Sequence, residues 1–261
     1  FKKTRLGNMT IKEIERYQTE GLKAGKAPAT VNRHIEALKH MFTKAVEWDI
    51  VDEAILKRVR RVKLMPENNR RLRFLSREEG AALVAACDNH LKPVVVTALN
   101  TGMRKGEILG LEWDRHIDLK HGFILLTDTK NGERRELPIN QTLRAALQGI
   151  ARKLHSPFVF CDPQGRRFRY VKRSFASALR RAGLKDFRFH DLRHTFASQL
   201  VMAGVDITTV SRLLGHKSLT MTLRYAHLAP AHLLKAVSVL DAGYDLVTLE
   251  KTKGAASQQT P

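Results

Sequence analysis

Three short segments of this chain carry side chains that suit chemistry on a phosphodiester. Residues 101–107 and 190–193 supply guanidinium and imidazole groups, and residues 214–225 supply a histidine and one tyrosine, Tyr225. A phenol is a poor nucleophile at neutral pH because its ordinary pKa is near ~10. It therefore needs a base or a positive environment before it attacks phosphorus. Arginines and histidines provide both, so these segments predict attack by Tyr225 on a phosphodiester.

Two arginines are placed to bind the phosphate. His190 and Arg193 are three residues apart, so both side chains leave one face of a helix that starts there. A planar guanidinium suits phosphate because its forked donors bind two oxygens at once. Arg104 precedes Glu107 by one helical turn, which allows the carboxylate to orient the guanidinium. We expect both arginines to hold the phosphate and Glu107 to support them.

A histidine and a lysine complete the expected site. His216 follows Gly215, where the missing side chain permits close approach to a ligand. Lys130 precedes an Asn-Gly pair that separates two strand-like runs, residues 123–129 and 133–139. Asn-Gly is the strongest short signal for a hairpin. A lysine at a hairpin tip can protonate the leaving sugar oxygen, so Lys130 is the expected general acid.

Each of these residues, taken alone, also has a purely structural interpretation. A tyrosine near a helix end usually packs or lies on the surface, and a His-x-x-Arg pattern occurs in many helices by chance. Arg104 and Glu107 alone would be a surface ion pair worth ~0–1 kcal/mol, and Lys130 alone a solvated turn lysine. Their occurrence together in this order favours the catalytic interpretation.

The composition indicates a polyanionic partner. The 261 residues include 46 Lys and Arg against 26 Asp and Glu, a formal charge of +20. Such an excess points first to nucleic acid. The cysteines Cys87 and Cys161 lack metal-ligand spacing, so we expect reduced thiols, no metal and a reducing compartment. No run of apolar residues approaches a membrane span. The chain begins at Phe1 rather than Met, so we expect it to continue a longer protein.

The first third of the chain reads as a small helical domain. Thr10 and Glu13 form a capping box that opens a helix ending near residues 21–25, and a second helix is expected to start near residue 30. Arg33 and Lys44 lie off the apolar face of the second helix and are candidates for DNA binding. Residues 57–73 are basic and poor in apolar side chains, which is typical of a linker lying against phosphates.

The remainder predicts a mixed catalytic domain. Ser76 opens another capping box, and a helix starts at Pro93. Further helices are expected over residues 143–154, 172–182, 191–203 and 206–215, followed by one that Ser218 caps and that carries Tyr225. We expect a fold that is mainly α with a small β-sheet or hairpin. The predicted division is a helical DNA-binding domain over residues 1–65, a basic linker over 66–74, a catalytic domain over 75–245 and a tail over 246–261.

Three runs of sequence resemble the signature motifs of one enzyme family. They are TGMRKGEILGL at 101–111, HDLRHTFAS at 190–198 and LLGHKSLTMTLRYAHL at 213–228. These runs closely resemble the tyrosine recombinases, the phage-integrase family, and the resemblance extends from about Thr10 to Leu228. It implies a role for each matching position. The expected roles are phosphate binding for Arg104 and Arg193, general acid/base chemistry for His190, a second histidine at His216, the hairpin lysine at Lys130, the supporting acid at Glu107 and the nucleophile at Tyr225.

The resemblance also implies a mechanism and partners. Family members clamp double-stranded DNA between a helical core-binding domain and the catalytic domain. They form a 3′-phosphotyrosine with a free 5′-hydroxyl, and work without metal or nucleotide cofactor as tetramers on paired sites, through a Holliday junction. Many integrases also carry an arm-binding domain before the core-binding one. We therefore expect a homotetramer of a phage or mobile element, acting on DNA in the cytoplasm and nucleoid of a bacterial host, without membrane association. An accessory DNA-bending protein is compatible with this expectation.

The sequence departs from the family at one place and leaves two alternatives open. Where relatives often have Asn-Pro after the second helix, this chain has Asp52 and Glu53. A type IB topoisomerase shares the same chemistry, but the short span from arginine to tyrosine and the preceding helical domain favour a recombinase. A non-catalytic DNA-binding protein is the other alternative, because residues 206–227 resemble helix-turn-helix spacing.

Overall fold

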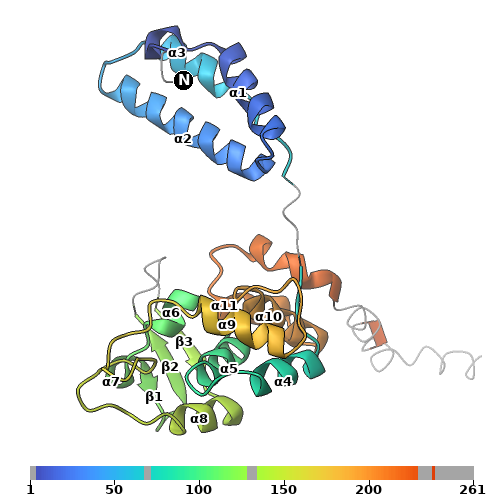
Figure 1. The fold of residues 1–261 in the computed structure, drawn as a ribbon. Helices are drawn as coiled ribbons and strands as arrows, with labels where there is room; N and C mark the ends of the chain where they lie inside the picture. The colour runs from blue at the N-terminus through green and yellow to red at the C-terminus, as the bar shows by residue number, and fades with distance from the viewer. Residues whose placement is uncertain (1–3, 68–71, 128–133, 229–236, 239–261) are drawn as a thin grey trace, which may run out of the picture. The chain divides into compact units, whose positions relative to one another are not determined.

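The computed structural model describes residues 4–67, 72–127, 134–228 and 237–238. The chain divides into two compact units, an N-terminal unit of residues 1–71 and a C-terminal unit of residues 72–261 (Figure 1). Both are mainly helical, and a small sheet lies in the second, which confirms the expected fold class. Within the described ranges, none of the helices combines the length and apolar character needed to cross a bilayer.

The described part of the N-terminal unit consists of a 3-10 turn and three α-helices. A short 3-10 turn, η1 (Leu6–Asn8), precedes α1 (Ile11–Lys23), α2 (Pro28–Glu47) and α3 (Glu53–Arg60). The predicted capping box at Thr10 is confirmed, since its hydroxyl accepts from the Glu13 amide at 3.2 Å. One apolar cluster of buried residues forms the core of this unit and comprises Met9, Ile14, Ile35, Phe42, Ile55, Leu56, Val59 and Val62.

The second half of α3, residues 57–60, lies where we expected a linker. Asp52 accepts from the Ala54 amide at 2.6 Å and caps the helix. Val59 and Val62 are buried at 1% and 2% exposure and close the core of the N-terminal unit. The prediction of a linker from residue 57 onward was therefore wrong up to residue 62, because basic residues on the outer face hid a short amphipathic helix.

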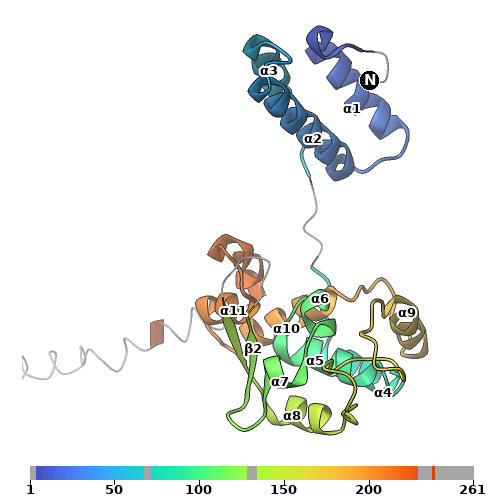
Figure 2. The ribbon, with the colours of Figure 1, turned by 90° about the vertical axis from the view of Figure 1, so that its left-hand side faces the viewer.

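The C-terminal unit surrounds a central helix, α5 (Lys92–Thr101), which packs against α8 and α10. Figure 2 shows the sheet and α9 on opposite sides of this helix. The helices of the unit, besides α5, are α4 (Arg77–Ala85), α6 (Lys105–Leu109), α7 (Trp113–His116), α8 (Gln141–Gln148), α9 (Lys172–Arg181), α10 (Asp191–Met202) and α11 (Ile207–Leu214), with the 3-10 segments η2 (Leu219–Met221) and η3 (Leu223–Leu228).

The sheet is an antiparallel meander of β1 (Ile117–Asp118), β2 (Phe123–Leu126) and β3 (Arg135–Pro138). Register places Leu126 opposite Arg135 and Ile124 opposite Leu137. Strands alternate sides with a period of two, so Arg135 and Leu137 both face the interior. The two expected strands are present but shorter than predicted, and β1 was not predicted because two residues give no periodic signal.

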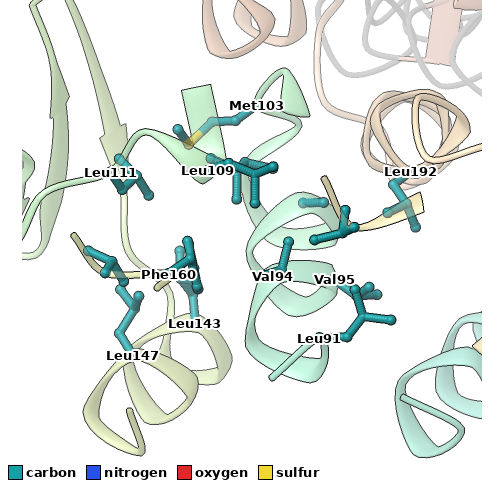
Figure 3. Packing of buried hydrophobic residues seen from close by; sticks show 14 of the residues in the cluster. Leu91, Val94, Val95, Met103, Leu109, Leu111, Leu143, Leu147, Phe160 and Leu192 are labelled. Atoms are coloured by element: carbon teal, nitrogen blue, oxygen red, sulfur yellow. The ribbon is translucent and has the colours of Figure 1, made fainter. Parts of the chain in front are cut away.

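The main core lies on both sides of α5 (Figure 3). Val94 and Leu109 lie towards Leu143, Leu147 and Phe160, while Leu192 of α10 lies on the other side. A second cluster joins α10, α11 and η3 around Phe196, Val210, Leu214 and Tyr225. The segments that carry the candidate site are therefore fixed to one another by apolar packing.

Two predicted helices in this unit were wrong in extent. The helix expected over 143–154 ends at Gln148, because the chain turns at Gly149 and Leu154 is 102% exposed, off any apolar face. The helix expected from Ser218 through Tyr225 is instead η2 and η3, divided at Thr222. Thr222 is fully buried.

Candidate active site

Arg193 ties together the ends of two helices. Its guanidinium lies in the first turn of α10 and is buried, at 5% exposure. Nη1 donates to the carbonyl of Gly102 at 2.7 Å, and Nη2 donates to the carbonyl of Leu214 at 2.5 Å. These carbonyls end α5 and α11, where the helix dipole favours positive charge. A guanidinium has five N–H donors, and these bonds use two of them.

Glu107 links two further arginines. Its Oε1 accepts from Arg104 Nη1 at 2.8 Å, and its Oε2 accepts both the Arg104 amide at 2.9 Å and Arg135 Nη2 at 2.8 Å. Burial raises the pKa of Glu107, but the charge of Arg135 and the hydrogen bonds from Arg104 outweigh burial and hold it below its ordinary value. The carboxylate is therefore ionised and fixes the direction of both guanidiniums.

Arg135 belongs to the site although the sequence reasoning did not assign it a role. Besides Glu107, it donates from Nη1 to the Leu214 carbonyl at 2.6 Å, the oxygen that also holds Arg193. A signal was present: alternation along β3 places this arginine on the same buried face as Leu137. Three guanidiniums thus converge through one carboxylate and one carbonyl.

Gly215 is required by this arrangement. It ends α11 with φ +63°, and a Cβ built there would lie 2.2 Å from Arg135 Nη1. The left-handed conformation turns the chain so that the Leu214 carbonyl faces the arginines. The next residue, His216, then bonds through Nδ1 to Thr222 Oγ1 at 2.7 Å.

The two predicted histidines border the arginine cluster. Burial, followed by the charges of Arg193 and Arg104, lowers the pKa of His216 to about 4, so its imidazole is neutral at neutral pH. His190 lies at the start of α10 on the surface. Partial desolvation and the charge of Arg193 also lower its pKa. Both rings therefore sit where positive charge already gathers.

Tyr225 is buried at 1% exposure, with its ring in the cluster that joins α10, α11 and η3. Its Oη lies 2.5 Å from Nδ1 of His194, a residue that the sequence reasoning did not single out. Burial raises the pKa of Tyr225, while Arg224 and Arg193 act against that rise. The phenol is thus close enough to the cluster for Arg193 to influence its ionisation.

An open pocket of about 520 Å³ adjoins these residues. Its lining is strongly basic and includes Arg104, Arg134, Arg135, Arg212 and His216. A pocket with this lining suits an anion, and a guanidinium cluster binds phosphate oxygens in particular.

Comparison with known proteins decides the family. The sequence model of the phage integrase family matches residues 73–232, which is more than half of the chain and contains every arginine, histidine and tyrosine of the cluster. The chain belongs to the phage integrase family.

Individual integrases are similar to this chain in sequence and in fold. The integrase of Salmonella phage P22 is 36% identical over 231 residues, covering 83% of the chain and 58% of the P22 protein. The solved catalytic domain of bacteriophage HP1 integrase is 34% identical, with a TM-score of 0.51 over 64% of the chain and 95% of that domain. A lambda integrase dimer bound to a COC' core site has the same fold, with a TM-score of 0.71 at 22% identity over 85% and 81% of the two chains. The chain spans about half the length of the curated relatives it matches.

The geometry of the cluster does not test three predicted site residues of this integrase-family chain. Lys130 lies outside the described residues. Arg33 and Lys44 are in the N-terminal unit, on α2. Arg33 is exposed, whereas Lys44 Nζ bonds to Glu47 Oε2 at 2.5 Å, so its charge is partly neutralised.

Proposed function

We propose that this chain is a site-specific DNA recombinase that cleaves and rejoins strands through a 3′-phosphotyrosine on Tyr225. The observation that carries the proposal is the convergence of Arg104, Arg135 and Arg193 through Glu107 and the Leu214 carbonyl, near enough to Tyr225 to influence its pKa. Such a cluster stabilises an anion whose negative charge increases in the transition state. Attack by a phenol on a phosphodiester creates that charge.

The proposed reaction assigns each group a task. Arg104 and Arg193 bind the non-bridging oxygens and stabilise the pentavalent transition state, with His216 completing the hydrogen bonds around the phosphate and His190 as the general acid/base partner beside it. The Tyr225 oxygen forms a bond to phosphorus as the bond to the 5′-oxygen breaks. Lys130 protonates that oxygen, so the products are a 3′-phosphotyrosine and a free 5′-hydroxyl. A 5′-hydroxyl from the second strand then reverses the step.

The proposal extends to the domains and partners. The core-binding domain over residues 1–65 and the catalytic domain over 75–245 would clamp double-stranded DNA, with residues 66–74 as a basic linker between them. The boundary between the two compact units, after residue 71, supports this division. The charge of +20 supports a polyanionic partner. The DNA held by the lambda integrase dimer supports a DNA partner. A homotetramer on paired sites, acting through a Holliday junction in the bacterial nucleoid, completes the proposal.

A covalent adduct tests the proposed function. The chain is incubated with nicked duplexes taken from DNA flanking its own coding sequence, and adducts are separated on a denaturing gel. We expect an adduct with the wild type and none with Tyr225→Phe, which should still bind DNA. Tyr170→Phe is the matched control, because Tyr170 is 82% exposed and lies outside the cluster. No wild-type adduct, or an undiminished one with Tyr225→Phe, overturns the proposal.

A further inference from the structure

One hydrogen bond in the buried part of the cluster has no counterpart in the roles assigned so far. His194 Nδ1 and Tyr225 Oη are 2.5 Å apart, and the two side chains are 9% and 1% exposed. We propose that His194 is the proton acceptor of Tyr225 during strand cleavage. The inference rests on the proposed function, because it requires Tyr225 to be the nucleophile.

The geometry favours His194 over the other two histidines of the site. Among the described residues, it is the histidine whose ring nitrogen lies within hydrogen-bond distance of the phenol, whereas His216 Nδ1 bonds to Thr222. The rings of His190 and His194 meet edge to face at 5.1 Å, and His194 meets Tyr225 at 5.9 Å. A base within hydrogen-bond distance of the hydroxyl is the usual arrangement for an activated nucleophile, and the ring of His190 packs against that base.

Helix α10 fixes the position of His194 relative to Arg193. His194 directly follows Arg193 on a helix whose first two turns are buried. Tyr225 is buried at 1% exposure, so its hydroxyl meets a phosphate only after the part of the chain around it moves. The imidazole and the phosphate-binding guanidinium do not separate in such a change, because both belong to one rigid element.

The charges around the pair are consistent with proton transfer in this direction. Burial, then Arg224, His190 and Arg193, lowers the pKa of His194 to about 4, with Asp191 acting against them. The ring is therefore neutral and accepts a hydrogen bond. A bound phosphodiester places negative charge beside these cations, which removes their part of the shift and raises the basicity of the ring. Burial raises the pKa of Tyr225, so the phenol does not ionise without an acceptor.

The step balances in atoms and charge. The Tyr225 O–H proton passes to His194 Nδ1 and leaves an imidazolium, while the phenolic oxygen forms the O–P bond. The P–O5′ bond breaks, and the general acid protonates the leaving oxygen. In the reverse reaction the imidazolium returns its proton to the departing tyrosine.

The test uses His194→Asn, because an Asn side chain can keep an acceptor near the Nδ1 position but cannot take a proton. His116→Asn is the matched control. His116 of α7 is also buried, and its Nδ1 accepts from the Glu112 amide at 3.0 Å rather than from a residue of the cluster. The substrate carries a 5′-bridging sulfur, whose departure needs no general acid, so the rate reports the nucleophile alone. Thermal unfolding and DNA binding of each full-length variant verify folding.

We expect His194→Asn to form adduct roughly 10²–10⁴-fold more slowly than the wild type at pH 7. The defect should shrink about tenfold per pH unit up to pH 9, because the ionised fraction of the phenol grows by that factor. A purely structural defect would not change with pH. His116→Asn should match the wild type.

Three outcomes overturn the proposal. A wild-type rate in His194→Asn reduces His194 to a residue that orients the phenol. A faster rate identifies the hydrogen bond as a restraint on Tyr225. A defect that stays constant with pH assigns a packing role. Adduct formation by the wild type and its loss in Tyr225→Phe keep the proposed function intact in all three cases, whereas absence of any wild-type adduct removes both.

Discussion

Replacing Glu107 with Gln tests whether the arginine cluster depends on its carboxylate. Arg135 is 8% exposed and Glu107 13%, so Glu107→Gln leaves a buried guanidinium without its counter-charge. Removing one partner of a buried ion pair costs about 3–5 kcal/mol. We expect the lower end, about 3 kcal/mol, because Gln keeps one acceptor oxygen and Arg135 keeps the Leu214 carbonyl. For a unit of this size, that predicts a Tm about 6–12 °C below the wild type.

The assay is thermal unfolding of the full chain, with Asp114→Asn as the matched control. Asp114 pairs with Arg152 at 2.6 Å, but their side chains are 82% and 51% exposed. An exposed pair contributes ~0–1 kcal/mol, so this control should barely move the Tm. A double variant, Glu107→Gln with Arg135→Met, should lose less than the sum of the single losses, because it removes the orphaned charge. A Tm for Glu107→Gln equal to that of the control would mean that the buried guanidinium of Arg135 does not depend on this carboxylate.

Three further predictions concern steric fit, pH and DNA contact. Gly215→Ala should destabilise the chain by more than Gly183→Ala. Both glycines have φ near +65°, but an added Cβ has open space only at Gly183. Equal losses of stability, of about 1–2 kcal/mol each, would mean that only backbone strain matters. The pKa values of His194 and His216 are lowered to about 4 from 6.5 in the folded chain. As pH falls below 6.5, these histidines are protonated in the unfolded chain but stay neutral in the folded chain, which favours unfolding. Urea unfolding should therefore show a stability loss of ~2 kcal/mol per histidine between pH 7 and pH 5, and a flat profile there would contradict it. Arg33→Ala should lower the salt slope of DNA binding by about one unit, and an unchanged slope would place Arg33 away from phosphates.

Local signals in the sequence were sufficient to locate most of the helices. The capping boxes at Thr10 and Ser76 and the caps at Asp206 and Gly215 all act within four residues of the chain, and each is present in the structure. Such signals operate through hydrogen bonds between near neighbours, so a single sequence reveals them. Where the determinant was an outer face rich in charge, as in α3, the same approach failed.

Contacts made across the fold were not predictable in this way. Arg135 meets Leu214 across 79 residues and His194 meets Tyr225 across 31, and neither pair has a spacing that marks it. The apolar register of β3 offered a hint for Arg135, because a charged residue on a buried face needs partners. His194 offered no such hint, because its partner depends on where η3 packs.

The convergence of the buried arginines Arg135 and Arg193 has a physical basis in two helix ends. The carbonyls of Gly102 and Leu214 belong to the ends of α5 and α11, and both helices end at a glycine with positive φ. A left-handed residue turns the chain away and leaves the last carbonyls directed outward, where the helix dipole makes them attractive to cations. Arg193 uses both carbonyls, so apolar packing of α5, α10 and α11 sets the guanidinium before any phosphate arrives. Because electrostatic stabilisation is most effective when its donors need no reorganisation, the two glycines are as much part of the candidate site as the arginines they position.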